Sequence, residues 1–411
     1  MINTDRLTHR LFTLGKIGAQ STGGITRLAF TKEDSDARLL VSSFMKEAGL
    51  IVREDEAGNL YGRREGTDPD APVVLTGSHI DSVYDGGIFD GNLGVIGAIE
   101  ALQVMNEQGI QTKHPIEVCA FKDEEGIRFC FSMTGSRAIA GILKPEDLEH
   151  QDKQGVSISQ AMTMCGLDPA QIGKAARAAG SIKAHVELHI EQGRVLESNN
   201  LPLGIVTGIN SSLWLHVTIE GEAGHAGATP MEIRHDSLSA AAEIILIVEE
   251  ESRKTGTSVG TVGKIHAFPG GINIIPGKVE FSIDLRDINQ ETGDSLEQAI
   301  LKRANEVCKK RGVKMTVEVL QRVPPVPCSS VVQNVIKDAF GKTGLPVFSL
   351  PSGAGHDSMH IARICPIGMI FVRSQKGISH NPEEWSTEED CAAGVEVLYH
   401  TLINLAVESK S

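Results

Sequence analysis

Short apolar runs alternate with amphipathic segments along the first half of the chain. Strands are expected at 72–80, 115–123 and 182–190, and helices at 39–50 and 94–109. The strand runs are almost continuously apolar or small, whereas the helical segments repeat apolar side chains every three or four residues. This alternation favours an α/β fold with a mostly parallel sheet covered by helices. Residues 1–210 are predicted to form the first segment of that domain.

The order of the elements changes between residues 211 and 327. Strands are expected at 213–221, 261–268, 278–287 and 313–323, and helices at 236–254 and 295–312. The order strand, helix, strand, strand, helix, strand is that of a ferredoxin-like α+β unit. Its exit is marked by the proline-rich stretch "VPPVPC", because proline removes a backbone donor and stiffens the chain. A second domain at 211–327 is therefore predicted to interrupt the first.

The last part of the chain, 328–411, returns to the α/β rhythm. A helix is expected at 330–342, a strand at 367–372 and a final helix after residue 385. Ser386 and Glu389 have the spacing of a capping box at the start of that helix. We expect this segment to complete the domain that residues 1–210 begin.

Composition narrows the classes of function. The 411 residues have a formal net charge of -14, which argues against binding to nucleic acid, because that affinity depends on clustered Lys and Arg. The seven cysteines form no C-x-x-C pair, which favours a reducing compartment over a disulfide scaffold. Neither a signal peptide nor a long apolar run is visible. The sequence predicts a cytoplasmic protein with no nucleic-acid or membrane partner.

Imidazole and carboxylate side chains follow several of the predicted strands. They are His79 and Asp81, Glu124 and Glu125, His189 and Glu191, and His380. Each alone has an ordinary explanation, since a histidine after a strand is more often a hydrogen-bonded structural residue and paired glutamates are usually a solvated turn. Ligands of open α/β sheets, however, bind at the carboxyl ends of the strands. Together these side chains predict a site of nitrogen and oxygen ligands suited to Zn, Mn, Co or Ni.

Spacing suggests roles for some of these residues. His79 and Asp81 are two positions apart, so Asp81 could accept the second ring N–H of His79 and fix its orientation. Glu124 and Glu125 are neighbours and should point in different directions, so that one could bind metal while the other acts on a water. Four further residues are spaced to share one face of an extended strand: His185, Glu187, His189 and Glu191. Their spacing alone does not show which of them binds metal.

Eight ordered motifs resemble the M20 metallopeptidase superfamily, in particular its hydantoinase/carbamoylase branch. They are "GSHIDSV", "GIFDGNLG", "DEEGIRF", "VELHIEQG", "GEAGHAGATPM", "GGINIIPGKVEFSIDLRD", "SGAGHDS" and "GISHNPEEW". The resemblance covers essentially the whole chain. The branch includes N-carbamoyl-L-amino acid hydrolases, allantoate amidohydrolases and β-ureidopropionases, and the end of the chain is most similar to the first of these.

The resemblance implies a dinuclear centre and assigns residues to it. The expected ligands of two divalent ions are His79, Asp90, Glu125, His189 and His380, with Asp90 bridging. Glu124 resembles the general base, which would take a proton from a water and give it to the leaving nitrogen.

Further residues are implied to bind substrate. They are Gln192, Asn273 and Arg286 for the α-carboxylate, His225 for the carbonyl in the site of a second subunit, and Gly355 in "SGAGH". The role of His225 requires a homodimer, and the inserted domain would serve as its lid and dimerisation domain.

The implied reaction is hydrolysis of N-carbamoyl-L-amino acids. Allantoate, N-carbamoyl-β-alanine or a dipeptide would need the same chemistry, so the fold cannot separate these substrates. A non-catalytic metal-binding protein is a further alternative, although pure binding needs no base at Glu124. The stretch Gly91–Gly97 has the spacing G-x-x-G-x-x-G, which does not match a dinucleotide-binding fingerprint.

Overall fold

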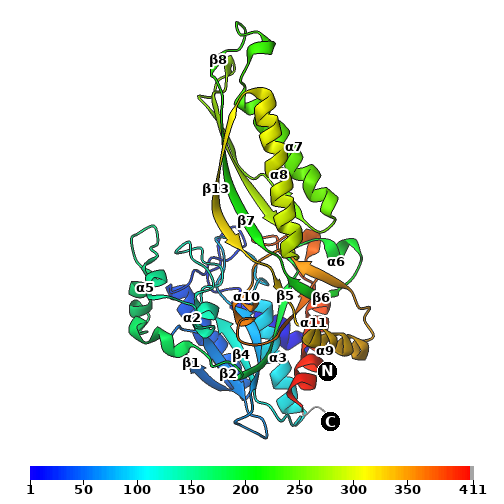
Figure 1. The fold of residues 1–411 in the computed structure, drawn as a ribbon. Helices are drawn as coiled ribbons and strands as arrows, with labels where there is room; N and C mark the ends of the chain where they lie inside the picture. Colours follow the sequence, from blue (N-terminus) through cyan, green and yellow to red (C-terminus); the bar gives the residue numbers. More distant parts are fainter. Residues whose placement is uncertain (408–411) are drawn as a thin grey trace. The chain divides into compact units, whose positions relative to one another are not determined.

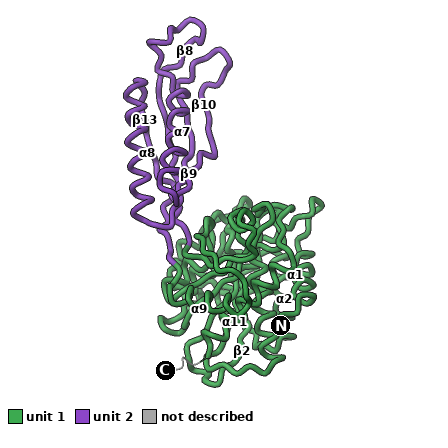
Figure 2. Tube along the Cα trace, turned by 90° about the vertical axis from the view of Figure 1, so that its right-hand side faces the viewer, with its two compact units in different colours: residues 1–208, 328–411 green, residues 209–327 purple. Residues whose placement is uncertain are grey.

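The computed structural model describes residues 1–407, which form two compact units. Unit 1 comprises Met1–Gly208 together with the chain from Cys328 onward, and unit 2 comprises Ile209–Pro327 (Figure 2). The sequence predicts divisions after residues 210 and 327, and the structure places them after residues 208 and 327.

Unit 1 is built on a nine-stranded mixed sheet, whose last strand, β14, lies at the boundary in sequence with unit 2. Its strands, in spatial order, are β1 (Ile51–Glu54), β2 (Leu60–Arg64), β4 (Ile116–Phe121), β3 (Val73–His79), β5 (Ile182–Ile190), β16 (Ile367–Val372), β6 (Leu203–Ile209) and β14 (Val326–Pro327), with β15 (Ser349–Ser352) paired to β6. The four central strands, from β4 to β16, run parallel. Antiparallel strands flank them on both sides. The predicted α/β class is confirmed, and the antiparallel flanks are an addition to it.

Helices pack against this sheet (Figure 1), and the side chains that they bury there are apolar. The long helices of unit 1 are α1 (Thr4–Leu14), α2 (Lys32–Glu47), α3 (Asn92–Glu107), α9 (Ser330–Thr343) and α11 (Glu388–Ala406). Shorter helices are α4 (Thr134–Ile139), α5 (Ile158–Met164), α6 (Val195–Ser198) and α10 (Ser358–Ile361). Residues of α1, α3 and α11 join side chains of β3 and β5 in one continuous apolar core. That core fixes the strand ends from which the site residues emerge.

The start of the last helix differs from the prediction. Thr387, not Ser386, is the N-cap of α11, and its side chain accepts the backbone N–H of Asp390 at 3.1 Å. Ser386 instead donates its hydroxyl to the carbonyl of Arg373 at 2.8 Å. Both hydroxyl residues fit the capping preference, and the tertiary contact of Ser386 decides between them.

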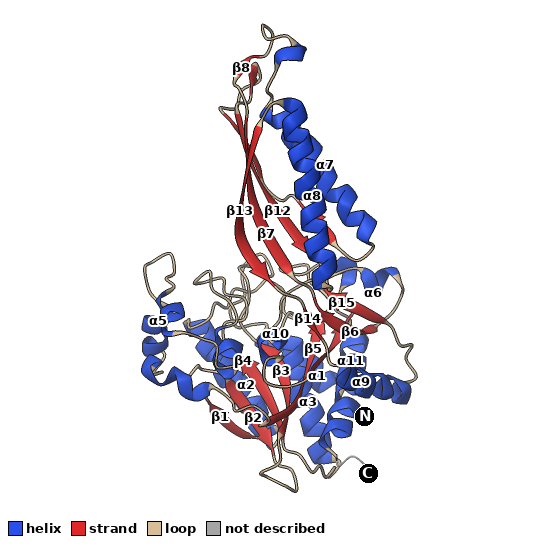
Figure 3. Cartoon of the chain, viewed as in Figure 1, coloured by secondary structure: helices blue, strands red, loops and turns tan. Residues whose placement is uncertain are grey.

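Unit 2 is an antiparallel sheet with two helices on one face (Figures 1 and 3). Its elements are β7 (Ser212–Glu220), α7 (Ser237–Thr255), β9 (Val259–Thr261), β10 (Ile265–Phe268), β12 (Lys278–Arg286), α8 (Gln290–Arg311) and β13 (Lys314–Val323). The strand order β10-β12-β7-β13 is that of a ferredoxin-like unit. The single strand expected at 261–268 is divided into β9 and β10, which both pair with β12. A separate ribbon pairs β8 (Gly224–His225) with β11 (Ile274–Ile275).

Side chains alternate strictly along β12. Phe281, Ile283 and Leu285 are buried in the core beneath α7 and α8, whereas Asp284 and Arg286 lie on the opposite, partly exposed face. The period of two along a strand explains this division and confirms that Arg286 lies on the polar face.

No helix among residues 1–407 is both long enough and apolar enough to span a bilayer. All seven cysteines lie in this described part and carry free thiols, and five of them are buried: Cys119, Cys308, Cys328, Cys365 and Cys391. Most of the cysteines therefore act as small core residues, as expected.

Candidate metal centre

A strand and a glycine-rich turn deliver the first two candidate ligands. His79 is the last residue of β3, and the chain then turns through Gly86, Gly87 and Gly91 before α3 begins. Gly91 has φ +65°, and a Cβ atom there would lie 2.5 Å from the ring of His79. Glycine is needed at this position because both the backbone angle and the contact with the ring exclude a side chain. The turn thereby brings Asp90 back against His79.

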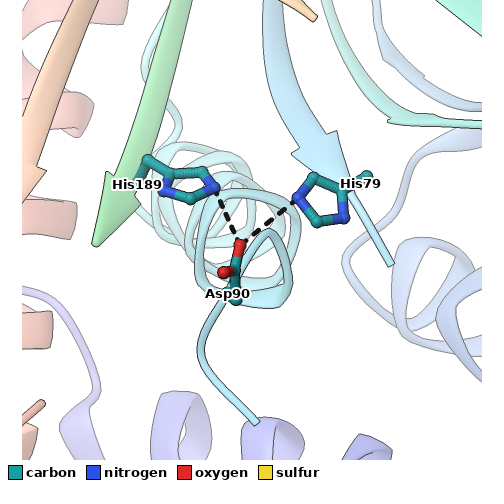
Figure 4. Close-up of side chains that lie close together, drawn as sticks. All are labelled: His79, Asp90 and His189. Carbon is teal, nitrogen blue, oxygen red and sulfur yellow. Dashed lines mark ion pairs between the residues drawn. The ribbon is translucent and has the colours of Figure 1, made fainter. Parts of the chain in front are cut away.

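The carboxylate of Asp90 lies at the centre of three histidines. Its Oδ1 atom is 3.5 Å from Nε2 of His79 and 3.2 Å from Nε2 of His189, which is near the end of β5 (Figure 4). Its Oδ2 atom is 3.3 Å from Nε2 of His380. His380 Nε2 is in turn 3.6 Å from Oε1 of Glu125. The five expected ligands therefore lie together.

Two groups of donor atoms share Asp90, and each could hold one cation. One group is His79, Asp90 and His189, and the other is Asp90, Glu125 and His380. With ligand bonds of about 2.1 Å and tetrahedral geometry, neighbouring donor atoms lie about 3.4 Å apart, close to the separations found here. The buried Nε2 atom of His189 makes no hydrogen bond of good geometry among the described residues, although Oδ1 of Asp90 lies 3.2 Å away. The residues thus fit divalent cations bound by nitrogen and oxygen.

Backbone carbonyls orient two of the rings. Nδ1 of His79 lies 3.1 Å from the carbonyl oxygen of Asp81, and Nδ1 of His189 lies 2.9 Å from that of Ile190. A proton on each Nδ1 leaves the lone pair of Nε2 for a metal ion.

The expected contact between the Asp81 carboxylate and the His79 ring is corrected. The nearest carboxylate oxygen, Oδ1, is 3.7 Å from Nδ1 of His79, and the backbone carbonyl of Asp81 takes that place. The carboxylate instead accepts the backbone N–H groups of Glu124 at 3.2 Å and Glu125 at 3.1 Å. Asp81 therefore holds the loop after β4 against the end of β3.

Glu124 and Glu125 point in different directions, as expected from their adjacency. Oε2 of Glu124 is 3.8 Å from Nε2 of His79, whereas Glu125 faces His380. Glu124 is only 8% exposed. Burial, together with the charge of Glu125, raises the pKa of Glu124 well above its usual value. A carboxylate with a raised pKa takes up a proton more readily than a free one, as a general base requires.

The charges of the acids and histidines at the site shift one another's pKa values. Burial and the charge of Asp90 raise the pKa of Glu125 to about 7, and the hydrogen bond to Asp90 raises the pKa of His380 to about 9. Burial alone would raise the pKa of Asp90, but the three histidines around it hold that pKa well below its usual value. So many buried carboxylates in one place are stabilised by positive charge, which a divalent ion supplies.

Of the four residues on one face of β5, His189 lies against Asp90, near the carboxyl end of the strand. Glu187 and His356 form a further group of possible ligand atoms with His189. Glu187 lies deeper and accepts the hydroxyls of Ser78 at 2.7 Å and Ser358 at 2.6 Å. Glu191 accepts the first N–H groups of α6, from Val195 and Leu196. His185 is fully buried below them.

Gln192 and Gly355 also lie in unit 1. Nε2 of Gln192 donates to Oδ2 of Asp90 at 2.8 Å, and Gln192 has φ +58°. A Cβ atom at Gly355 would lie 3.1 Å from the methyl group of Met133. Gln192 thus contacts a candidate ligand directly, in a backbone conformation that is rare for a residue with a side chain.

The other expected substrate residues belong to unit 2. Arg286 donates to its neighbour Asp284 at 3.0 Å. Nδ1 of the exposed His225 accepts the N–H groups of Gly227 and Ala228, so its ring proton is on Nε2. The backbone carbonyl of Asn273 accepts the N–H of Ala226, which joins the segments that contain His225 and Asn273.

Sequence reasoning missed one buried acid at the site, Glu384. Its carboxylate accepts the backbone N–H of Asp90 at 3.0 Å. The signal available was its position four residues after His380, within the motif "SHNPEEW".

Comparison with known proteins agrees with this geometry. The model of the peptidase family M20/M25/M40 matches residues 75–404. The chain belongs to this family. It is 59% identical over 406 residues to an N-carbamoyl-L-amino acid amidohydrolase of Geobacillus stearothermophilus, covering 99% of each chain. It is 45% identical to an N-carbamoyl-L-amino-acid amidohydrolase of a Pseudomonas species, covering 98% of each chain.

A solved structure is similar over its full length as well. It is an amidase of the hydantoinase/carbamoylase family from Burkholderia multivorans, with a TM-score of 0.94, 34% identity, and coverage of 99% of this chain and 98% of that one. These relatives confirm the family and its hydantoinase/carbamoylase branch, with the α/β catalytic unit and the separate antiparallel unit.

Proposed function

We propose that the chain is a metal-dependent amidohydrolase that cleaves N-carbamoyl-L-amino acids to the L-amino acid, carbon dioxide and ammonia. The observation that supports this most strongly is the pair of donor groups sharing Asp90, with the buried carboxylate of Glu124 beside them. Full-length similarity to enzymes named for this reaction supports the choice of substrate.

Two divalent ions, of Zn, Mn, Co or Ni, are proposed as cofactors. The ligands would be His79, Asp90 and His189 for one ion, and Asp90, Glu125 and His380 for the other. Divalent ions bound in this way lower the pKa of water and polarise a carbonyl oxygen.

The residues of the chain would then move the protons. Glu124 accepts a proton from the water that adds to the carbamoyl carbon, and passes it to the α-nitrogen as the C–N bond breaks. The products are the free amino acid and carbamate, which decomposes to carbon dioxide and ammonia. Asp81 keeps Glu124 in place through the backbone N–H groups it accepts.

Further residues are proposed to bind the rest of the substrate. Arg286 is proposed to form a two-pronged contact with the α-carboxylate, a geometry that lysine cannot copy. Asn273 and Gln192 would hydrogen-bond the same group, and Gly355 would present backbone to the substrate. Nε2–H of His225 would donate to the carbonyl oxygen in the site of a second subunit, in a homodimer formed through unit 2. A reducing, cytoplasmic location fits the seven free thiols.

Ammonia release from the purified protein tests this function. The protein is reconstituted with each candidate metal ion and offered N-carbamoyl-L-methionine, its D-enantiomer and allantoate, with a chelator as control. Turnover of the L-compound alone, abolished by the chelator, is expected. Preference for allantoate would replace the substrate but keep the reaction class, and no turnover of any compound would contradict the proposal.

A further inference from the structure

Glu384 is a buried acid with no assigned role in the reaction. It is 3% exposed and forms no ion pair with a Lys or Arg among the described residues. Its Oε1 atom accepts the backbone N–H groups of Phe89 and Asp90, both at 3.0 Å. Its Oε2 atom lies 2.9 Å from the hydroxyl of Ser379. All of these partners are next to, or part of, the candidate ligands.

The surrounding chain is shaped to admit this carboxylate. A Cβ atom at Gly87 would lie 2.1 Å from Oε1 of Glu384, so only glycine leaves the space that the side chain occupies. The ring of Trp385 packs edge-on against Phe89, with centroids 5.4 Å apart. The segment after His380 is therefore fitted against the turn before α3, although nearly 300 residues separate them in sequence.

The contacts of Glu384 connect two ligands of one donor group. Asp90 and His380, together with Glu125, form the second group. Glu384 holds the backbone of Asp90, and Ser379, which precedes His380, lies 2.9 Å from Oδ2 of Asp90. His380 has φ +55° and a side chain that is 48% exposed, so packing around its own ring does little to fix it. Its position depends on neighbours such as Ser379.

We propose that Glu384 is a positioning residue, which holds Asp90 and His380 at the separation that the ion of the second group requires. This proposal rests on the two-ion site proposed above. It implies that Glu384 affects the ion of the second group more than the other. The second group takes two of its three ligands, Asp90 and His380, from segments that Glu384 or Ser379 contacts, whereas the first group takes only Asp90 from them.

Three variants of the full-length protein test the proposal. Glu384→Ala removes the acceptor. Glu384→Gln keeps a carbonyl oxygen for the two backbone N–H groups and offers an amide N–H to Ser379. Glu100→Ala is the matched control, because Glu100 is a fully buried glutamate of α3 that pairs with Arg6 instead of the site. Titration of the metal-free proteins with Co²⁺, followed by calorimetry and by visible absorption, gives the number of ions, their affinities and their coordination.

We expect the loss of Glu384 to weaken the binding of the two ions unequally. Glu384→Ala binds the ion of the second group about 10- to 100-fold more weakly, with loss of that ion's part of the absorption spectrum, whereas the affinity for the other ion falls by much less. Glu384→Gln and Glu100→Ala bind both ions as the wild type does. Gly87→Ala, which displaces the carboxylate without removing it, reproduces the selective loss even if Glu384→Ala does not fold.

Several outcomes would overturn the inference. Wild-type affinities for both ions in Glu384→Ala would do so, as would equal weakening of both. Failure of Glu384→Gln to restore binding would show that the hydrogen bonds are not what matters. Absence of Co²⁺ binding by the wild type would instead contradict the proposed two-ion site, so the two failures are distinguishable.

Discussion

The carboxylate of Asp81 accepts the backbone N–H of Glu124 at 3.2 Å, which links the end of β3 to the proposed base. The other carboxylate oxygen of Asp81 accepts the N–H of Glu125. In Asp81→Asn an amide N–H group replaces one of these two oxygens, so that it faces a backbone N–H and one hydrogen bond is lost. We expect Asp81→Asn to lower kcat by about 10- to 100-fold while KM changes little. Steady-state kinetics on N-carbamoyl-L-methionine measures both. A large rise in KM with unchanged kcat would contradict this role.

If Glu124 is the base, a substitution there should lower activity without removing the metal ions. Glu124→Gln keeps the shape of the side chain but cannot accept a proton, so we expect kcat to fall by about 10²- to 10⁴-fold. Metal content, measured by elemental analysis, should stay that of the wild type. His79→Ala is the comparison, since it should lose metal as well as activity. Full activity of Glu124→Gln would end the proposed mechanism.

The strand ends could be predicted from the sequence because the apolar pattern itself stops there. The run that forms β3 ends at His79, and the next strand of the sheet, β4, ends just before the loop that contains Glu124. The choice of His189 over Glu187 could not be made, because both side chains lie on one face and only the depth of each in the sheet separates them.

Contacts made by backbone atoms, or between segments far apart in the chain, could not be predicted from the sequence. That Asp81 uses its carbonyl for His79 and its carboxylate for Glu124 depends on the turn after β3. Thr387 replaces Ser386 as the helix cap because Ser386 bonds to Arg373. Such contacts have no period along the chain, so pattern reasoning cannot find them.

The absence of a side chain at Gly91 leaves room for the ring of the candidate ligand His79. A Cβ atom there would lie 2.5 Å from the ring of His79, so Gly91→Ala should displace that ligand and weaken metal binding by at least about 10-fold. Gly109→Ala is the control, because Gly109 has φ +66°, nearly the same as Gly91, but a Cβ atom there would meet no described atom within 4 Å. Calorimetric titration with Zn²⁺ compares them. Equal loss of affinity in both variants would assign the effect to backbone strain alone.

Arg286 should matter only for substrates that carry an α-carboxylate. Arg286→Lys is expected to lower kcat/KM for N-carbamoyl-L-methionine by about 10- to 100-fold, since a charged two-pronged contact is lost. The same variant should leave unchanged the slow turnover of an N-carbamoyl alkylamine, which has no carboxylate. Arg303→Lys, at an arginine that pairs with Glu250 on the helices of unit 2, is the control. A similar loss on both substrates would argue against carboxylate recognition.

His360 should contribute to a fall of stability in mild acid. Burial, with the nearby charges of Arg137 and Arg363, lowers the pKa of His360 to about 3. An unfolded histidine has a pKa of about 6.5, so below that pH the unfolded chain binds a proton that the folded chain does not. The stabilising contribution is therefore complete above a pH of about 6.5 and is lost as the pH falls toward the folded pKa. Between pH values of about 7.5 and 5 the loss should be about 1–2 kcal/mol.

Urea unfolding of the metal-free protein at several pH values tests this dependence. His360→Gln should unfold with a shallower fall of free energy between pH values of about 7.5 and 5, because the glutamine does not titrate. His9→Gln, at an exposed histidine of α1, should keep the wild-type slope. Identical slopes for His360→Gln and the wild type would mean that another group causes the loss in acid.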